Sequence, residues 1–268
     1  MNGQTRAFGE SLRTLRKEQG FSQAELAARL GTTQRHVSFL ETGRAAPSRF
    51  MLERIERELA LPIARVQVLF ENAGFVSPYK RRTEDSPDVI AALDLIDRYL
   101  LANWPFPAFV LDKHWNVLRQ NTPGRALLDD LAGPHNRHAN FFEIFLSPSF
   151  RKRVLNWRDA APIFAARLYR AASHDEAMRS LLDQAQKAGL LDDLEVTGRD
   201  DIPVFVPVEI EGPDGQRLRL TSLLGQLASV QDAIVEGMTV EMMVPLDDGS
   251  QECLLAAAQS AFPLKAAE

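Results

Sequence analysis

Cysteine is almost missing from this sequence, in which Cys253 is the only one among 268 residues. A lone cysteine cannot form a disulfide within the chain, which fits a reducing compartment and a small apolar role for this side chain. Long apolar runs are missing too, because no stretch approaches the roughly 18–20 residues of a membrane span. The first residues also lack the apolar segment of a signal peptide. We therefore expect a soluble, globular, cytoplasmic chain without a membrane partner.

Signatures of catalysis are absent as well. There is no glycine-rich phosphate loop, no serine or cysteine in a nucleophile motif, and no pair of carboxylates at a defined turn. His135 and His138 have the spacing of metal ligands, but neither a cysteine nor a carboxylate completes a set, and Gly133-Pro134 indicates a surface loop. The sequence thus predicts no enzyme, no metal site and no cofactor.

The charge that is present is unevenly distributed. Hydrophobic residues make up 45% of the chain, enough for about two domains with cores of their own. Residues 1–82 carry 14 Lys and Arg against 8 Asp and Glu, and the remainder carries 17 against 28, so net charges of +6 and -11 underlie the overall -5. A basic N-terminal part beside an acidic remainder indicates that the N-terminal part alone contacts phosphate groups. Runs of charged residues are, however, usually just solvent-exposed faces.

Two short helices joined by a glycine turn are predicted between residues 22 and 47. Ser22 and Glu25 form a capping box that starts the first helix, and Gly31 ends it. Thr32 can accept a backbone N–H bond as the N-cap of the second helix. A helix that ends at Gly20 precedes this pair, and two further helices, predicted to start at Ser48 and Pro62, follow it.

The second helix of the pair turns Val37 and Leu40 inward. Its outward or flanking residues are Gln34, Arg35, His36, Ser38 and Phe39. Glutamine can pair bidentately with adenine, arginine with guanine, and an apolar group can contact the thymine methyl. Such a helix suits the major groove of DNA, and the alternative is an ordinary helical hairpin.

The pattern over residues 8–60 resembles the repressor-type helix-turn-helix of lambdoid phages and of the bacterial XRE-like family. The motif that carries the resemblance is Ser22-Gln23-x-x-Leu26-Ala27, Gly31, Thr32-Thr33-x-x-x-Val37-Ser38-x-x-Glu41-x-Gly43 and Pro47. The resemblance implies an all-α head of five helices that binds double-stranded DNA.

The resemblance also implies roles for single residues. In such repressors the residue matching Gln23 lies against a phosphate, and those matching Gln34, Arg35 and Phe39 face base edges; Phe39 replaces a common polar residue and favours a methyl contact. A partly buried ion pair of Arg16 with Glu41 is implied to fix one helix against another. The expected DNA-binding residues are Gln23, Thr32, Thr33, Gln34, Arg35, His36, Ser38, Phe39 and Arg44.

A boundary between two domains is predicted in residues 76–87. This stretch has two prolines and a basic run but no apolar periodicity, which is typical of a linker. We therefore expect a head of residues 1–75, a linker with a connecting helix over 76–104, and a second domain over 105–268. The connecting helix, over 88–103, has an apolar stripe that can pack on its own domain or on a second chain.

The second domain shows strands and helices in alternation. Strands are predicted at 108–112, 115–119, 204–210, 217–221 and 238–246, with Asn121 at a helix start and Pro213-Asp214-Gly215 as a hairpin turn. Ser147 with Pro148, and Ser173 with Glu176, are predicted helix starts, Gly189 a helix end, and Asp247–Ser250 the turn into a last helix. The fold class is thus α+β multidomain, with a mainly antiparallel sheet and helices on one side of it.

Residues 105–262 resemble the ligand-binding domain of MmyB-like transcription regulators, a PAS-like module, most clearly over 107–170. The residues that carry this are Pro107-Ala108-Phe109-Val110-Leu111-Asp112, Trp115-Asn116-Val117-Leu118, Asn121, Asn140, Phe145, Pro148, Arg151, Trp157, Ala161 and Leu168. Aromatic side chains on consecutive helices can line a pocket or simply form the core. The expected ligand-binding residues are Phe109, Phe141, Phe145, Trp157 and Phe164.

Two functions fit these features. One is a homodimeric one-component regulator whose second domain senses a small, largely apolar ligand, for example a fatty-acid-like one. The other is a DNA-binding regulator whose second domain only dimerises or recruits a partner protein.

Overall fold

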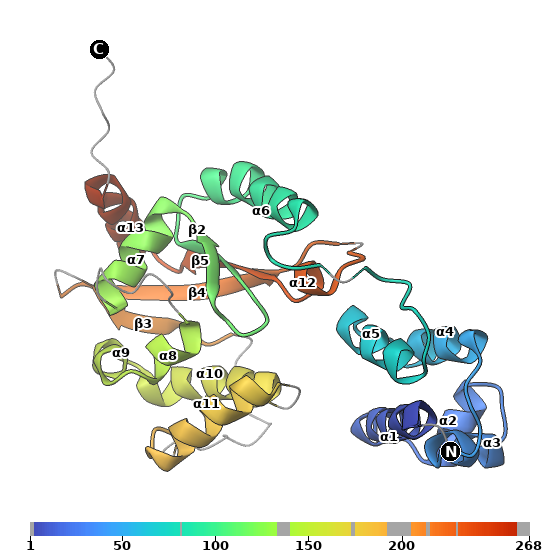
Figure 1. Ribbon diagram of the computed structural model, residues 1–268. Helices are drawn as coiled ribbons and strands as arrows, with labels where there is room; N and C mark the ends of the chain where they lie inside the picture. The colour runs from blue at the N-terminus through green and yellow to red at the C-terminus, as the bar shows by residue number, and fades with distance from the viewer. Residues whose placement is uncertain are drawn as a thin grey trace. The chain divides into compact units, whose positions relative to one another are not determined.

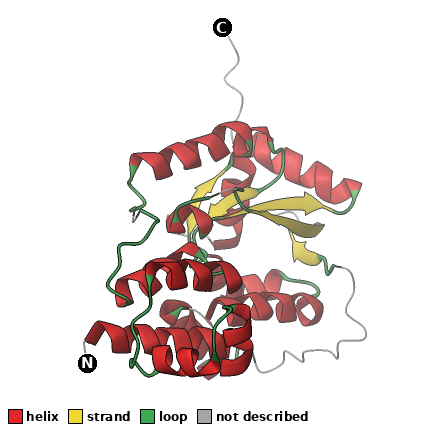
Figure 2. Cartoon of the chain, turned by 90° about the vertical axis from the view of Figure 1, so that its right-hand side faces the viewer, coloured by secondary structure: helices red, strands yellow, loops and turns green. Residues whose placement is uncertain are grey.

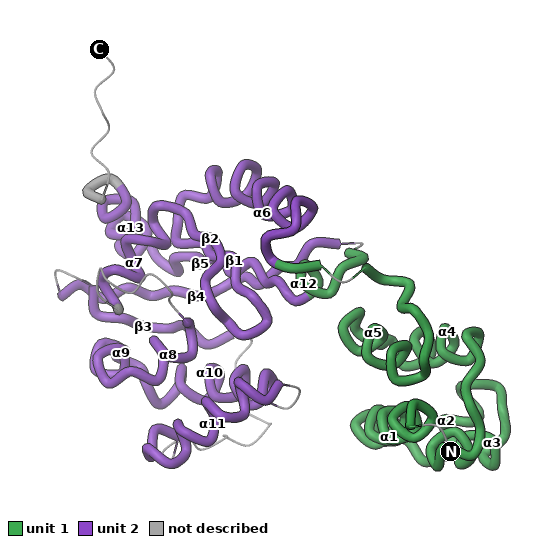
Figure 3. The backbone as a smooth tube through the Cα atoms, viewed as in Figure 1, with its two compact units in different colours: residues 1–83, 229–236 green, residues 84–228, 237–268 purple. Residues whose placement is uncertain are grey.

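The computed structural model describes residues 3–80, 82–132, 140–172, 175–191, 205–212, 215–228 and 230–261. The chain forms two compact units, shown in two colours in Figure 3. The first comprises residues 1–83 and 229–236, and the second comprises 84–228 and 237–268. A short segment from late in the chain therefore belongs to the same unit as the N-terminal helices. Among the helices that can be described, none is both long and apolar enough to span a membrane.

The first unit contains the five predicted helices (Figure 1). They are α1 (Gly3–Glu18), α2 (Gln23–Arg29), α3 (Gln34–Glu41), α4 (Arg49–Glu58) and α5 (Ile63–Asn72), with the short α12 (Ala233–Glu236) added from the late segment. Their apolar faces form one core, and Val37 and Leu40 are buried in it as predicted. The capping box of Ser22 with Glu25 and the cap at Ser48 are confirmed.

The start of α3 differs from the prediction by one residue, because Thr33 and not Thr32 is its N-cap. Gly31, with φ of +53°, donates its N–H to the carbonyl of Ala28. Thr32 donates its N–H to the carbonyl of Ala27. These two bonds are the Schellman ending of a helix, so Thr32 still belongs to the end of α2. The next residue is the first that can cap α3.

Close approach of α1 to α3 depends on Gly9. A Cβ atom at this position would lie 2.6 Å from the carbonyl oxygens of both Leu40 and Glu41. Any larger side chain would therefore push α1 away from the last turn of α3, the helix expected to contact DNA.

The second unit is a five-stranded sheet with helices around it (Figure 2, strands in yellow). The strand order is β2-β1-β5-β4-β3, and every neighbouring pair is antiparallel. The strands are β1 (Ala108–Leu111), β2 (Val117–Gln120), β3 (Val208–Glu211), β4 (Arg217–Gly225) and β5 (Thr239–Pro245). The helices are α6 (Pro87–Tyr99), η1 (Leu101–Asn103), α7 (Thr122–Ala132), α8 (Phe141–Leu146), α9 (Pro148–Arg153), α10 (Trp157–Ala172), α11 (Glu176–Lys187) and α13 (Asp248–Ala261).

Helices cover both faces of the sheet at β1, which corrects the prediction of one covered side. Phe109 and Val110 are successive residues with opposite directions, and both are 0% exposed. On the Val110 face, the paired Arg119 donates a hydrogen bond to Asp97 of α6, over 3.2 Å. The physical reason is the sequence of β1, since an uninterrupted apolar strand is typical of burial on both faces. The apolar stripe of α6 is likewise buried, in its own unit, through Val89, Leu93 and Ile96.

Several predicted boundaries need correction or lie outside the described residues. The N-cap of α11 is Asp175, which accepts a hydrogen bond from the N–H of Met178, so Glu176 is the first helical residue and cannot complete a capping box. Gly189, with φ of +66°, follows α11 as expected. The predicted cap Ser173, the strand start Val204, the turn residues Pro213 and Asp214, and the histidines His135 and His138 lie outside the described residues.

Candidate functional site

The outward side of α3 is the first candidate surface. Gln34 and Arg35 are exposed at its start, while His36, Ser38 and Phe39 are half-buried. Thr33 accepts a hydrogen bond from the N–H of His36, over 3.2 Å, and fixes the first turn. A capped helix start with exposed polar side chains is what base readout in a major groove requires.

Phe39 lies between two guanidinium groups on this surface. The guanidinium carbon of Arg35 is 5.2 Å from the centre of the Phe39 ring, and that of Arg44 is 5.9 Å from it. Both distances fit cation–π attraction. The ring is thereby flanked by positive charge, a combination that suits a thymine methyl next to backbone phosphates.

An ion pair beneath α3 holds this helix to α1 and confirms the pair implied by the sequence. Nε of Arg16 donates to Oε1 of Glu41 over 2.5 Å, and Nη2 donates to Oε2 over 3.1 Å. Their side chains are 11% and 2% exposed. Nη1 of Arg16 donates to the carbonyl of Phe21 over 2.7 Å, which ties in the start of α2 as well.

Gln23 completes this arrangement by donating from its amide to Oε2 of Glu41, over 2.8 Å. Burial by itself would raise the pKa of Glu41, but the hydrogen bonds from Arg16 and Gln23 outweigh it, and the pKa lies below its ordinary value. The pKa of Arg16 is raised, chiefly by the hydrogen bond to Glu41. The carboxylate therefore stays ionised and holds three helices together.

The second candidate site is an apolar cavity of about 70 Å³ between the sheet and the helices. It is several times larger than the ~10–15 Å³ that one water molecule needs. The lining residues come from α7, α8, α9, α10 and three strands: Leu127, Leu128, Leu131, Phe141, Ile144, Phe145, Phe150, Phe164, Val208, Ile210, Leu220, Thr221, Ser222, Glu241 and Met243.

Three of the five aromatic residues predicted to contact a ligand line this cavity: Phe141, Phe145 and Phe164. The other two stand one layer behind them. Phe109 contacts Phe141 edge to face, with ring centres 5.0 Å apart, and Trp157 stacks on Phe145 at 5.1 Å. Phe109 and Trp157 therefore support the lining residues but do not line the cavity themselves.

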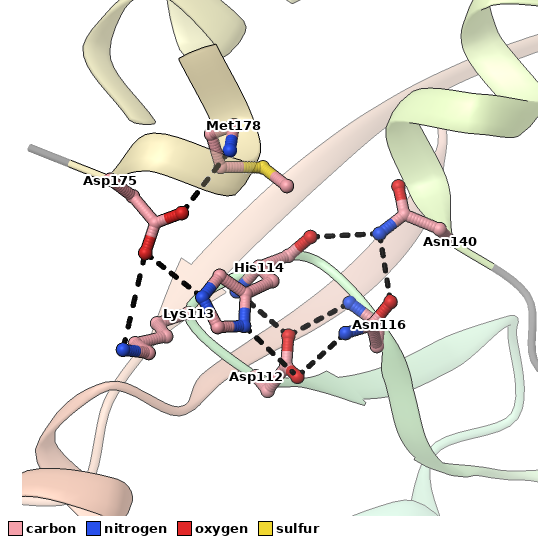
Figure 4. Close-up of polar contacts among 7 residues, drawn as sticks. All are labelled: Asp112, Lys113, His114, Asn116, Asn140, Asp175 and Met178. Carbon is pink, nitrogen blue, oxygen red and sulfur yellow. Dashed lines mark hydrogen bonds and ion pairs between the residues drawn. The ribbon is translucent and has the colours of Figure 1, made fainter. Parts of the chain in front are cut away.

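A polar cluster fixes α8, which carries Phe141 and Phe145, to the β1–β2 turn (Figure 4). Asn140 caps α8 by accepting from the N–H groups of Phe142 and Glu143. Its amide donates to the carbonyl of His114, over 2.8 Å, and to Oδ1 of Asn116, over 2.9 Å.

The same turn holds the start of α11. Nε2 of His114 lies 2.9 Å from Oδ2 of Asp175, and Nζ of Lys113 lies 4.0 Å from the same oxygen (Figure 4). Burial would raise the pKa of Asp175, but hydrogen bonds from the N–H of Met178 and from His114 lower it below its ordinary value. The turn thus joins two helices to the sheet beside the cavity.

Glu241 is the functional candidate that the sequence analysis missed. It lies on β5, lines the cavity and is 2% exposed. Oε1 accepts a hydrogen bond from the hydroxyl of Ser222, over 2.6 Å, and lies 3.5 Å from Nη1 of Arg167. A signal was available, since Glu241 is the one charged residue in a strand of otherwise apolar character.

An exposed helix that follows a tight helix–helix turn, together with a separate domain that contains an apolar cavity, is typical of DNA-binding transcription regulators with a ligand-binding domain. Comparison with known families agrees: residues 12–66 match the helix-turn-helix family, and residues 97–256 match the MmyB-like transcription regulator ligand binding domain. The second match spans more than half of the chain. The protein belongs to the MmyB-like transcription regulators.

Individual relatives cover smaller parts of the chain. An uncharacterized HTH-type transcriptional regulator of Methanothermobacter thermautotrophicus is 46% identical over 48 residues, which are 18% of this chain and 70% of that protein. The crystal structure of the clp gene regulator ClgR from C. glutamicum is 30% identical, with 28% of this chain and 94% of that chain covered and a TM-score of 0.24.

Proposed function

We propose that the protein is a homodimeric one-component regulator in which a small, largely apolar ligand in the cavity changes the affinity of the head for DNA. The head comprises residues 1–75, the linker and connecting helix 76–104, and the ligand-binding domain 105–268. The observation that carries the proposal is the apolar cavity between the sheet and the helices, because a domain that served only dimerisation or recruitment would need no empty apolar space there.

The proposed DNA contacts are Gln23, Thr32, Thr33, Gln34, Arg35, His36, Ser38, Phe39 and Arg44. Arg35 is exposed near the start of α3, where repressor-type heads contact base edges, and we assign it to a guanine. Arg44 is exposed just beyond α3 and suits a phosphate.

Replacing Arg35 by alanine is expected to weaken binding to the specific operator by about 1–3 kcal/mol and to relax the preference at one base pair. The operator is first selected from random duplexes, and the affinities for all single-base variants are then measured for both proteins. Arg44→Ala is the matched control and should weaken binding about equally for every sequence. Equal weakening across sequences by Arg35→Ala would make Arg35 a phosphate contact.

The proposed homodimer is supported by the small reach of one recognition helix, since dimers of such heads bind two half-sites about one helical turn apart. The selected operator should contain a repeated half-site, and sedimentation of the complex should show two protein chains. A single chain on a single short site would contradict the dimer.

Coupling between cavity and head is supported by segment 229–236, which joins β4 to β5. Both strands line the cavity, through Ser222 and Glu241, yet this segment belongs to the first unit. Oε2 of Glu236 accepts a hydrogen bond from the N–H of Ile63, over 2.8 Å, where Pro62 provides no side-chain cap for α5. A carboxylate at a helix N-terminus is favoured by the unpaired N–H groups and the helix dipole.

Glu236→Ala is expected to remove most of the effect of a cavity ligand on DNA affinity while both binding reactions persist. The reason is that a ligand can shift the head only through an element whose arrangement it favours, and a tenfold shift needs about 1.4 kcal/mol. DNA affinity is titrated with and without ligand in both proteins. Glu252→Ala, on the exposed side of α13, serves as control; an undiminished ligand effect in Glu236→Ala would rule out this route.

A further inference from the structure

One atom in the wall of the cavity lacks the partner that its chemistry requires. Oε2 of Glu241 is buried, and it accepts no hydrogen bond from any residue that the structure describes. The other oxygen, Oε1, is engaged with Ser222 and lies near Arg167. A buried carboxylate oxygen without a donor is costly, and natural proteins rarely leave one unless a ligand or a water completes it.

The rest of the wall has almost no polar groups to offer a ligand. Among the lining residues, only Thr221 and Ser222 accompany Glu241 as polar residues. All three lie on β4 and β5, and the rest of the lining is made of leucine, isoleucine, valine, methionine and phenylalanine. A complementary ligand is therefore apolar over most of its surface and polar where it meets Glu241.

Charge decides which polar group fits that end. Arg167 balances the charge of Glu241, and its guanidinium carbon also lies 5.7 Å from the Trp115 ring and 6.0 Å from the Phe164 ring. An ammonium on the ligand would add a positive charge to a pair that is already neutral. A carboxylate would meet Glu241 directly, because Arg167 is not among the residues that line the cavity. Either ion would therefore leave a net charge in a buried, mostly apolar site.

We propose that the ligand is a neutral, mostly apolar molecule with a hydroxyl group, an alcohol or a phenol, and that this hydroxyl donates a hydrogen bond to Oε2 of Glu241. The proposal rests on the ligand-binding function proposed above and narrows it. It also replaces the fatty-acid-like ligand by one without a free carboxylate.

Four probes of matched length test this proposal on the full chain: 1-octanol, 1-methoxyheptane, octanoate and octylamine. The first two have the same number of heavy atoms, but only the alcohol donates a hydrogen bond. Affinities are measured calorimetrically at neutral pH. We expect 1-octanol to bind at least about tenfold more tightly than the ether, since a hydrogen bond to a charged group is at stake. Octanoate and octylamine should bind more weakly than the alcohol.

Two variants assign the preference to Glu241. Glu241→Leu removes the acceptor and should make the alcohol and the ether bind equally. Glu241→Leu also leaves Arg167 without any acceptor at this position. Glu241→Gln is a milder second variant, because it removes the negative charge but keeps a neutral acceptor oxygen, and it should bring the affinity for octanoate closer to that for the alcohol. Thermal unfolding of each variant, recorded without probe, shows whether it is folded.

A third variant, Leu128→Trp, fills the cavity and separates failure of this proposal from failure of the ligand-binding function. If the ether equals the alcohol in the natural protein, or if octanoate binds most tightly, the hydroxyl proposal is wrong while the cavity remains a binding site. If Leu128→Trp binds every probe as the natural protein does, or if no probe binds the natural protein, the ligand-binding function fails and the hydroxyl proposal with it.

Discussion

Arg16→Met should lower the free energy of unfolding of the first unit by about 3–5 kcal/mol, because it leaves the carboxylate of Glu41 buried without its charge partner. Of the donors to Glu41 that the structure describes, the amide of Gln23 would remain. All three tryptophans, Trp104, Trp115 and Trp157, lie in the second unit, so their fluorescence does not follow this loss. Hydrogen exchange of the backbone amides in α1 and α3 does follow it, and these amides should exchange faster in the variant.

Arg6→Met is the matched control. Arg6 pairs with Glu10 over 3.1 Å, but the two side chains are 75% and 68% exposed, so the loss should stay under about 1 kcal/mol. The double change Arg16→Met with Glu41→Leu should restore much of the stability, because no charge then remains buried. Equal losses of stability in Arg16→Met and Arg6→Met would show that the buried pair of Arg16 with Glu41 contributes no more than an exposed ion pair.

Acid should reproduce part of this effect in the natural protein. The pKa of Glu41 in the folded chain lies below the ordinary 4.5, so its ionised form stabilises the fold. That contribution is fully present above pH 4.5 and is lost as the pH falls through the lower folded value. In Arg16→Met, this part of the acid sensitivity should disappear.

Asn121→Leu is expected to destabilise the second unit by about 3 kcal/mol or more, since it strips several backbone groups of their partner at once. Oδ1 accepts from the N–H of Ala108 over 3.0 Å and from that of Gly124 over 2.9 Å. The amide donates to the carbonyl of Phe106 over 2.7 Å and to that of Trp104 over 3.0 Å. Urea unfolding followed by tryptophan fluorescence measures the loss.

Asn103→Leu provides the comparison within the same unit. The amide of Asn103 donates to the carbonyls of Arg98 and Tyr99, but these bonds are exposed, and water can replace them. A change within about 0.5 kcal/mol is expected. If Asn121→Leu and Asn103→Leu unfold at the same urea concentration, Asn121 does not hold β1, α7 and the preceding loop together.

The head could be predicted closely because its signals are local. Ser22, Glu25 and Gly31 each act on residues within one helical turn, and the error at Thr32 arose from two hydrogen bonds that close the previous helix. The position of Glu241 could not be predicted in this way. Its direction depends on pairing of β5 with β1 and β4, which no short sequence pattern specifies.

The aromatic residues show the same limit. The accumulation of aromatic residues on consecutive helices pointed to Phe141, Phe145 and Phe164, which do line the cavity. This pattern could not distinguish them from Trp157, because the rotation of a helix against the sheet decides which of its aromatic side chains reaches the cavity and which packs behind it. Phe109 was predicted to line the cavity but stands behind the lining, for a related reason. A strand that is buried on both faces shows no alternation of polar and apolar residues that would mark the face toward the cavity.

The strand order also determines when this protein can fold during translation. Ala108 pairs with Met242, so the middle of the sheet joins residues that are far apart in the chain and leave the ribosome at different times. Until β5 leaves the ribosome, β1 has only β2 beside it and shows its other edge, with the apolar Phe109 and Val110, to the cell. Such distant pairing is slow and prone to aggregation. We therefore expect chaperones to bind the nascent chain between the synthesis of β1 and that of β5, and slow codons just before β5 to prolong that exposure.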